Sequence, residues 1–220
     1  MRLLVLGASG ACGRHVVRIA VERGHDVTAV MRPGSGYRPL ESVESVIGQV
    51  TDRAFLHSVV VGHDTILSCL GLRRASILPW SRLLSPPDLV QRVTALLLDA
   101  VPPSARVIWI SAGGVGDSRR LATLPIRLMI RSGHVGTAYD DLEVAESRVR
   151  SAGRTWLAVR PVTLVNGRPT GRASAVSRYS LSSVVRRGDV AQWMVDVADG
   201  AVRWDEDTVL LGAGGHTPSA

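Results

Sequence analysis

A glycine pattern near the start of the chain sets strong limits on its fold. An apolar run over residues 3–6 ends at Gly7, and glycine recurs at Gly10 and Gly13. Residues 14–23 follow with apolar side chains at helical spacing, and Gly24 is placed to end that helix. A buried strand, a glycine turn and a helix, in this order, form the context of a dinucleotide-binding turn.

Each glycine has a mechanical role in such a turn. Gly7 allows the tight bend, Gly10 lets the backbone approach a pyrophosphate, and Gly13 lets the helix pack close to the strand. The helix N-terminus adds unpaired N–H groups and a partial positive charge. We therefore predict that the phosphates of a dinucleotide contact the whole turn: Gly7, Ala8, Ser9, Gly10, Ala11, Cys12 and Gly13. The alternative is a glycine-rich strand–helix turn without a ligand.

Length and composition indicate one domain over residues 1–220. The chain has 220 residues, 45% of them hydrophobic, which suffices for one full core. No apolar run approaches the ~20 residues of a membrane span, and the N-terminal run is interpreted as a strand rather than a signal peptide. We therefore expect no membrane partner. The two cysteines lack metal-ligand spacing, which predicts no metal site and favours a reduced, cytoplasmic location.

Arginine supplies all of the basic charge. The chain has 26 arginines, no lysine and a net charge of +7. The arginines are scattered, and no aromatic-rich RNA motif accompanies them, so we expect no nucleic-acid partner. The charge fits a solvated basic surface with an anionic cofactor pocket.

The second predicted strand, residues 26–32, ends where this type of fold binds the adenosine ribose. An acidic residue there favours NAD, whereas an arginine accommodates the 2′-phosphate of NADP. Arg32 lies 19 residues after Gly13, close to the expected spacing of about 20. We interpret Arg32 as the 2′-phosphate ligand, with Arg38 as a second candidate. The alternative is a surface arginine at the end of a strand.

Four further strands are predicted at residues 45–48, 64–71, 106–114 and 154–161, with a last one at 208–211. Helices are expected over residues 53–61, 88–101, 137–151 and 188–195, with a loop and an amphipathic helix between 117 and 130. Asp52 is a candidate N-cap of the helix at 53–61. The alternation predicts an α/β doubly wound parallel sheet, the Rossmann fold. Residues 112–140 and 162–187 would form a small substrate-side region.

Ligands bind outside the carboxyl ends of strands, where the strand order reverses. This rule places Cys69, Leu70 and Gly71 beside the pyrophosphate and the nicotinamide ribose. Cys69 and Cys12 are interpreted as small packing residues, although a helix N-terminus can lower the pKa of a thiol such as Cys12.

By these motifs the chain resembles the atypical short-chain dehydrogenase/reductases of the NAD(P)H-binding, NmrA-like group, including the flavin reductase/biliverdin reductase B family. The resemblance rests on the glycine turn, Arg32, Ser111, the helix with Glu146 followed by Gly153, residues 156–161, and Gly188 to Ala191. That family uses NADPH to reduce flavins and tetrapyrroles. The resemblance implies that the nicotinamide lies near Ser111 and the sixth strand, and that the loop after the third strand flanks the adenine. The cofactor residues so implied are Val50, Asp52, Ser111, Ala112, Arg160, Pro161, Val162 and Thr163.

The chain departs from its relatives in its candidate catalytic groups. Typical members use a Tyr-x-x-x-Lys pair, but Tyr139 is followed four residues later by Glu143, and no lysine exists to lower its pKa. Tyr139 is therefore either catalytic or a packing and substrate-binding residue, and Ser111 is the second catalytic candidate. Thr163 stands where the flavin/biliverdin reductases have a histidine; His134, in a Gly-flanked loop, either reaches the site or is exposed.

Two functions remain open. The first is an NADPH-dependent oxidoreductase that passes hydride to a planar acceptor such as a flavin or quinone, with stacking and alignment as the main protein contribution. The second is a non-catalytic redox sensor that binds NAD(P) and acts through protein partners. The expected partner is a small molecule, and the chain is expected to be a monomer or a homodimer.

Overall fold

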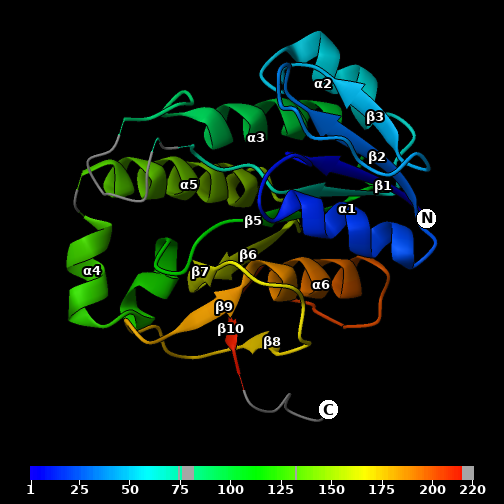
Figure 1. Ribbon diagram of the computed structural model, residues 1–220. Coiled ribbons are helices and arrows are strands. Elements are labelled where there is room, and N and C mark those ends of the chain that lie inside the picture. Colours follow the sequence, from blue (N-terminus) through cyan, green and yellow to red (C-terminus); the bar gives the residue numbers. More distant parts are fainter. Residues whose placement is uncertain (74, 76–81, 132, 215–220) are drawn as a thin grey trace.

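The computed structural model describes residues 1–73, 75, 82–131 and 133–214 (Figure 1). Its elements along the first half of the chain are β1 (Arg2–Leu6), α1 (Gly13–Glu22), β2 (Asp26–Met31), β3 (Glu44–Ile47), α2 (Arg53–Val60), β4 (Thr65–Ser68), α3 (Leu89–Ala100) and β5 (Arg106–Ile110). The second half contains a 3₁₀ helix η1 (Gly116–Leu121), α4 (Leu124–Ile130), α5 (Gly133–Ser151), β6 (Leu157–Pro161), β7 (Thr163–Val165), β8 (Ala173–Ala175), β9 (Val184–Arg186), α6 (Arg187–Ala198) and β10 (Thr208–Ala213).

Eight strands form one sheet in the order β3-β2-β1-β4-β5-β6-β10-β8. The pairs from β3 to β10 are parallel, and β8 pairs with β10 in the antiparallel direction. The strand order reverses between β1 and β4. The predicted doubly wound sheet is therefore confirmed, with an antiparallel strand added at one edge.

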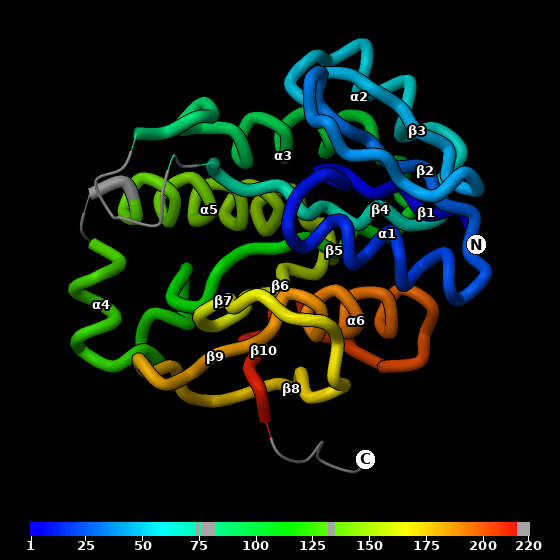
Figure 2. Tube along the Cα trace, in the orientation of Figure 1, coloured from blue at the N-terminus to red at the C-terminus, as the bar shows by residue number. Residues whose placement is uncertain are grey.

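The pleat of β1 sends alternate side chains into two separate cores. Leu3 and Val5 pack on the face that α1 and α6 cover, and Leu4 and Leu6 pack on the face that α2, α3 and α5 cover. All four are fully buried. Four consecutive buried apolar residues are typical of a strand in a parallel sheet with helices on both faces, and Figure 2 shows this layered arrangement.

Helix α3 is held by a carboxylate from a neighbouring helix. The backbone N–H groups of Val90 and Gln91 each donate to Asp141 of α5 at 2.9 Å. Asp88, directly before α3, makes no side-chain capping hydrogen bond. This tie fixes α3 against α5 on the same face of the sheet.

The substrate-side region predicted from the sequence contains short elements that the sequence does not specify. Strands β7 and β9 form a separate two-stranded parallel sheet, and β8 is likewise only three residues long. Helix α5 begins at Gly133, four residues before the predicted start at 137, and β4 ends at Ser68, before the predicted end at Gly71. Among the described residues no helix is long and apolar enough to cross a membrane.

Candidate functional site

The turn between β1 and α1 has the geometry that its glycines predict. Gly7 has a φ of +74°, a region that favours glycine. A Cβ atom on Gly13 would lie 2.3 Å from the carbonyl oxygen of Gly7. The N–H of Gly10 donates to that same oxygen at 2.9 Å. The turn therefore closes around the carbonyl of Gly7, and only glycine at position 13 lets α1 begin so close to β1.

The start of α1 leaves consecutive N–H groups available to a ligand. Within the described part of the chain, the backbone N–H groups of Ala11, Cys12 and Gly13 have no hydrogen-bond acceptor. The first turn of α1 holds no acidic residue that would compete for them. Unpaired N–H groups and the positive end of a helix are the features that bind a phosphate. The turn therefore fits the pyrophosphate of a dinucleotide.

Both cysteines beside the turn have raised pKa values. Burial raises the pKa of the Cys12 thiol to about 11, although the positive charge of Arg187 acts in the opposite direction. Desolvation likewise raises the pKa of Cys69 well above its usual range. The idea that the helix N-terminus lowers the pKa of Cys12 is wrong, because burial has the larger effect. Thiols that stay protonated at neutral pH fit packing residues rather than nucleophiles.

Most of the other predicted cofactor residues meet at one edge of the sheet. Strands β2, β1, β4, β5 and β6 are parallel neighbours, so their carboxyl ends lie along the same edge. In strand order this edge carries Arg32, the glycine turn, Cys69 to Gly71, Ser111 with Ala112, and Arg160 to Thr163. The reversal of strand order falls at the glycine turn, where this class of sheet binds its ligands.

Arg32 directly follows β2 and is exposed. Within the described residues it forms no ion pair and no side-chain hydrogen bond, so its guanidinium is available to a ligand.

Arg14, which the sequence did not single out, lies next to the turn: its Nε donates to the carbonyl oxygen of Ser9 at 2.9 Å. Its guanidinium carbon also lies 4.9 Å from the ring centroid of Tyr37, on the loop that follows Arg32. Arg14 thus lies beside the turn, and Arg32 follows the strand next to β1.

The loop after β3 has a structural role that the sequence predicts. The carboxylate of Asp52 accepts a hydrogen bond of 3.0 Å from the N–H of Phe55 and so caps α2. Val50 is half-buried in the same loop. The cap fixes this loop at the carboxyl end of β3, beside Arg32 on the neighbouring strand.

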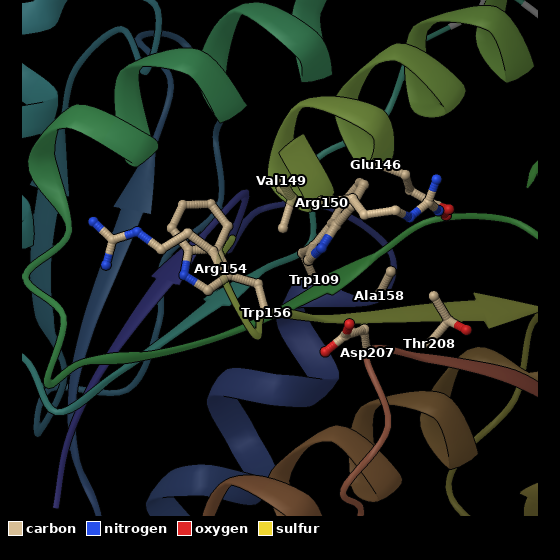
Figure 3. Close-up of a pocket in the computed structure, with 9 residues that line it drawn as sticks. All are labelled: Trp109, Glu146, Val149, Arg150, Arg154, Trp156, Ala158, Asp207 and Thr208. Carbon is tan, nitrogen blue, oxygen red and sulfur yellow. The ribbon is translucent and has the colours of Figure 1, made fainter. Parts of the chain in front are cut away.

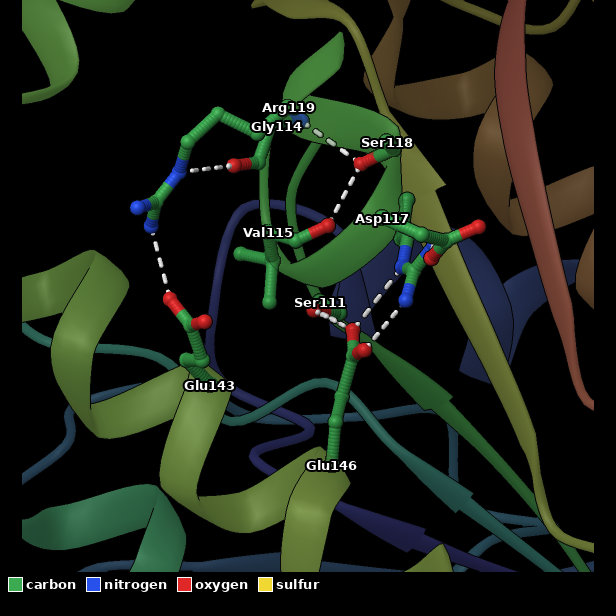
Figure 4. A network of polar contacts seen from close by, with 9 residues as sticks. Ser111, Gly114, Val115, Asp117, Ser118, Arg119, Glu143 and Glu146 are labelled. Atoms are coloured by element: carbon green, nitrogen blue, oxygen red, sulfur yellow. Dashed lines mark hydrogen bonds and ion pairs between the residues drawn. The ribbon is translucent and has the colours of Figure 1, made fainter.

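A buried ionic network lies behind the carboxyl ends of β5 and β6 (Figure 4). The hydroxyl of Ser111 donates to Glu146 Oε1 at 2.6 Å. Arg160 binds both oxygens of Glu146, with Nε to Oε1 at 3.0 Å and Nη2 to Oε2 at 2.5 Å. Its third nitrogen reaches Asp117 of η1 at 2.6 Å. Ser111, Glu146 and Arg160 are all at most 5% exposed.

The charges in this network stabilise one another. Burial alone would lower the pKa of Arg160, but its bonds to Glu146 and Asp117 raise that pKa above the usual value. Burial also tends to raise the pKa of Asp117, yet the bond from Arg160 makes the net change a lowering. The side chain of Arg160 is therefore committed to two carboxylates. A contact between Arg160 and a cofactor would have to use its backbone.

The hydroxyl of Ser111 is oriented by the same network. A hydroxyl has one proton to donate and two lone pairs. Because its proton is directed to Glu146, the oxygen of Ser111 is left as an acceptor. It can receive a hydrogen bond from a carboxamide N–H, whereas a bond to a substrate carbonyl would require the hydroxyl to leave Glu146.

The hydrogen bonds described for Tyr139 and Thr163 go to different partners, so these contacts do not make the two residues a catalytic pair. The hydroxyl of Tyr139 donates to the carbonyl oxygen of Gly113 at 3.0 Å. Glu143, one turn further along α5, binds Arg119 at 2.6 Å. Thr163 is exposed, and its hydroxyl lies 3.3 Å from that of Tyr179. The side chain of His134 lies outside the described residues.

The loop between β5 and η1 is closed by its own hydrogen bonds. The N–H of Gly114 donates to Ser118 Oγ, and that hydroxyl donates to the carbonyl of Val115 at 2.6 Å. The bond between Asp117 and Arg160 then ties η1 to β6. The network therefore connects strand ends at the candidate nicotinamide position with the substrate-side region.

Arg187 is a second residue that the sequence analysis missed. It is the first residue of α6, its Nη1 donates to Asn166 Oδ1 at 2.8 Å, and its charge acts on Cys12 in the turn. Arg187 is 174 positions from Gly13, so no local pattern could have indicated its proximity. The Gly188–Asp189 motif beside it was the only available signal.

A small cavity on the α5 face of the sheet is separate from this edge (Figure 3). Its volume is about 30 Å³. The residues that line it are Trp109, Glu146, Val149, Arg150, Arg154, Trp156, Ala158, Asp207 and Thr208. That volume holds roughly one water molecule. Of the candidate site, only Glu146 lines it.

A family model described as NAD(P)H-binding matches residues 7–200. The chain belongs to this NAD(P)H-binding family, which confirms the resemblance drawn from its motifs and supports a nicotinamide cofactor.

Curated relatives match only part of the chain. It is 35% identical over 88 residues to divinyl chlorophyllide a 8-vinyl-reductase from Oryza sativa subsp. indica, covering 34% of this chain and 22% of that protein. It is 32% identical over 80 residues to isoflavone reductase homolog IRL from Zea mays, covering 32% and 26%. The chain therefore matches about a quarter of the length of these relatives.

Solved structures match nearly the whole chain. The anaerobilin reductase ChuY from Escherichia coli O157:H7 superposes with a TM-score of 0.72 at 20% identity, covering 100% of both chains. A proposed NADH-flavin reductase from Streptococcus pneumoniae superposes with a TM-score of 0.72 at 19% identity, covering 97% of this chain and 100% of that one. At these identities the likeness establishes the shared fold.

Proposed function

We propose that this protein is an NADPH-dependent oxidoreductase that passes hydride to a planar acceptor such as a flavin or a quinone. The observation that carries the proposal is the alignment along one sheet edge of a phosphate-binding turn, an unpaired arginine after β2, and an oriented serine after β5. Membership of the NAD(P)H-binding family supports the nicotinamide part of it.

The preference for NADP is proposed from the corner around Arg32. No acidic residue occurs between Met31 and Leu40 to accept the ribose 2′-hydroxyl, whereas Arg32 is unpaired and exposed. Arg14, held by Ser9 and stacked near Tyr37, adds a second positive charge beside the turn. Guanidinium groups bind a phosphate through charge-assisted hydrogen bonds, which an uncharged hydroxyl cannot match.

The residues of the chain would contribute positioning rather than proton transfer. The N–H groups of Ala11, Cys12 and Gly13 would hold the pyrophosphate. Ser111 Oγ would accept a hydrogen bond from the carboxamide N–H while its own hydroxyl proton stays directed to the carboxylate of Glu146. Bound NADPH supplies the hydride. No lysine is available to lower the pKa of Tyr139, so the proton that completes the reduction comes from solvent. Positioning of this kind suffices when the acceptor is an aromatic ring system.

The names of the structural relatives support the acceptor class. One is called an anaerobilin reductase and another a proposed NADH-flavin reductase, so both are named as reductases and one of them as acting on a flavin. We extend that class to this chain as a proposal.

The test is NADPH oxidation, followed by absorbance at the reduced-nicotinamide band, with excess FMN and with a simple quinone. Acceptor-dependent oxidation that Ser111→Ala slows would support the proposal.

The second candidate function is a redox sensor that binds NAD(P) without turnover. It is favoured by the hydrogen bond of Tyr139 to Gly113 and by the absence of lysine. Tight NADPH binding without turnover on either acceptor would select the sensor.

A further inference from the structure

The positive charge of the protein is concentrated in the substrate-side region. Residues 112–140 and 162–187, which make up this region, contain nine arginines and only two carboxylates, those of Asp117 and Asp140. The net charge of the region is therefore +7, equal to that of the whole chain, so the remaining residues together are neutral. Of these nine arginines, only Arg119 pairs with a carboxylate among the described residues. The region therefore presents a large uncompensated positive charge.

The same region exposes large apolar side chains. Leu124 and Leu128 of α4 are 66% and 62% exposed, and Leu181 is 63% exposed. Leu124 and Leu128 are four residues apart and so lie on one face of the helix. The bridge between Ala122 and Tyr179 brings the start of α4 beside the segment that carries Leu181. In Figure 1, α4 stands at the outside of the molecule.

Arginines border these leucines. We call Leu124, Leu128 and Leu181, together with the exposed Arg120, Arg127, Arg131 and Arg178, the α4 face. Arg127 of α4 and Arg131, directly after it, are four residues apart and form a neighbouring row on one side of the row that Leu124 and Leu128 form. Long arginine side chains can lie along an apolar surface while their charge stays in water or meets phosphate.

We propose that the α4 face binds the surface of a lipid bilayer that contains anionic headgroups. An apolar helix face bordered by basic residues is the pattern of helices that lie in the membrane interface. The four arginines of the α4 face suit an anionic surface, and anionic lipids attract such basic segments electrostatically. The contact is peripheral, so it requires no membrane-spanning helix and departs from the expectation of no membrane partner.

A second copy of the chain is a poorer occupant of the α4 face. A symmetric dimer would place the same positive region of each copy against the other. Like charges brought together in this way oppose association. An anionic bilayer instead neutralises the arginines and accepts the leucines.

The test is cosedimentation of the purified protein with vesicles of phosphatidylcholine alone and of phosphatidylcholine mixed with phosphatidylglycerol. We expect binding to the mixed vesicles to be at least about tenfold tighter, and to weaken as salt is added. The measurement needs no cofactor and no turnover, so its outcome does not depend on the proposed function.

The variant that tests the apolar part is Leu124→Glu with Leu128→Glu. The matched control is Leu40→Glu with Val61→Glu, two exposed apolar residues outside the α4 face, at 54% and 74% exposure. We expect the first variant to lose about tenfold or more in affinity for the mixed vesicles and the control to lose little. Thermal unfolding of both variants shows whether they fold, and exposed positions should tolerate the change.

Three results would overturn the proposal. One is no sedimentation with the mixed vesicles, and another is equal binding to both vesicle types. The third is a dimer in solution that the α4 variant converts to a monomer while vesicle binding is unchanged, which would assign the α4 face to a second copy.

Discussion

Gly13 occupies a position where a methyl group would lie 2.3 Å from a backbone oxygen of the preceding turn. Glu146 accepts hydrogen bonds from both a serine and an arginine inside the protein. These two residues represent the two ways in which single positions determine the candidate site. One acts through space that must stay empty, and the other through charges that must stay paired.

Gly13→Ala should destabilise the protein by about 1–3 kcal/mol, because backbone must move to admit the methyl group. Gly71→Ala is the control, since a Cβ there meets nothing within 4 Å and its φ is not positive. Chemical denaturation of both variants measures the difference. Equal midpoints for Gly13→Ala and the unsubstituted protein would contradict the close packing of α1 on β1.

Glu146→Gln should cost about 3–5 kcal/mol, because it leaves the buried charge of Arg160 without its main partner. Glu143→Gln removes the partner of Arg119 in a surface pair that is 40% and 47% exposed, and should cost less than about 1 kcal/mol. The free energy of unfolding of the two variants separates a buried pair from an exposed one. Similar small losses would mean that the network is not the support inferred for Ser111.

Contacts between elements decide how the layers hold together. Arg23 at the end of α1 binds Asp196 and Asp199 at the end of α6, and the bond to Asp199 is 2.7 Å. Burial tends to raise the pKa of Asp199, but the bonds from Arg23 and from the N–H of Ala201 lower it overall. A carboxyl with a lowered folded-state pKa stabilises the fold when it is ionised.

Asp199→Asn should therefore reduce stability at neutral pH. The contribution of Asp199 is complete above its unfolded pKa, declines as pH falls between the unfolded and the folded value, and is absent below the folded value. The stability gap between the variant and the unsubstituted protein should close in acid. Denaturation at neutral pH and at a pH below the usual aspartate range checks this, and a gap that stays constant with pH would refute the assignment.

The sequence predicts the elements that local pattern specifies. The mainly apolar runs at residues 3–6, 26–32 and 106–114 predict strands, and β1, β2 and β5 form there, with β5 ending at Ile110, before the predicted end. Strands β7, β8 and β9 have three residues each and depend on partners far away in the chain. The early start of α5 was missed because Gly133 and Gly136 weaken the helical pattern there.

The residues of the candidate site likewise divide into those set by local sequence and those set by contacts between distant parts of the chain. The glycine turn and the cap by Asp52 are local in sequence, and both have the predicted geometry. The bonds of Glu146 to Ser111 and Arg160 span 35 and 14 residues, and Arg187 approaches the turn only through the packing of α6 on α1. Contacts of this range follow from the completed sheet, so no local spacing could specify them.

Across the molecule, the candidate cofactor residues and the excess of positive charge both follow the carboxyl ends of the central strands. The carboxyl edge of the sheet gathers the candidate cofactor residues, and the substrate-side region carries nine arginines against two aspartates. An anionic dinucleotide and an anionic surface would both be attracted to this side. The position of Arg32 at that edge is what links the fold to the proposed choice of cofactor.

The most direct test of this link is an equilibrium titration of the purified protein and of Arg32→Ala with NADPH and with NADH. We expect the unsubstituted protein to prefer NADPH, and Arg32→Ala to lose roughly ten- to a hundredfold in NADPH affinity, because a charged hydrogen bond to phosphate is worth about 1.5–3 kcal/mol. NADH affinity should change little. Arg2→Ala removes the same charge from the amino-terminal end of β1 and should leave both affinities unchanged. Equal NADPH affinity in Arg32→Ala and the unsubstituted protein, or no binding of either nucleotide, would contradict the proposed cofactor site.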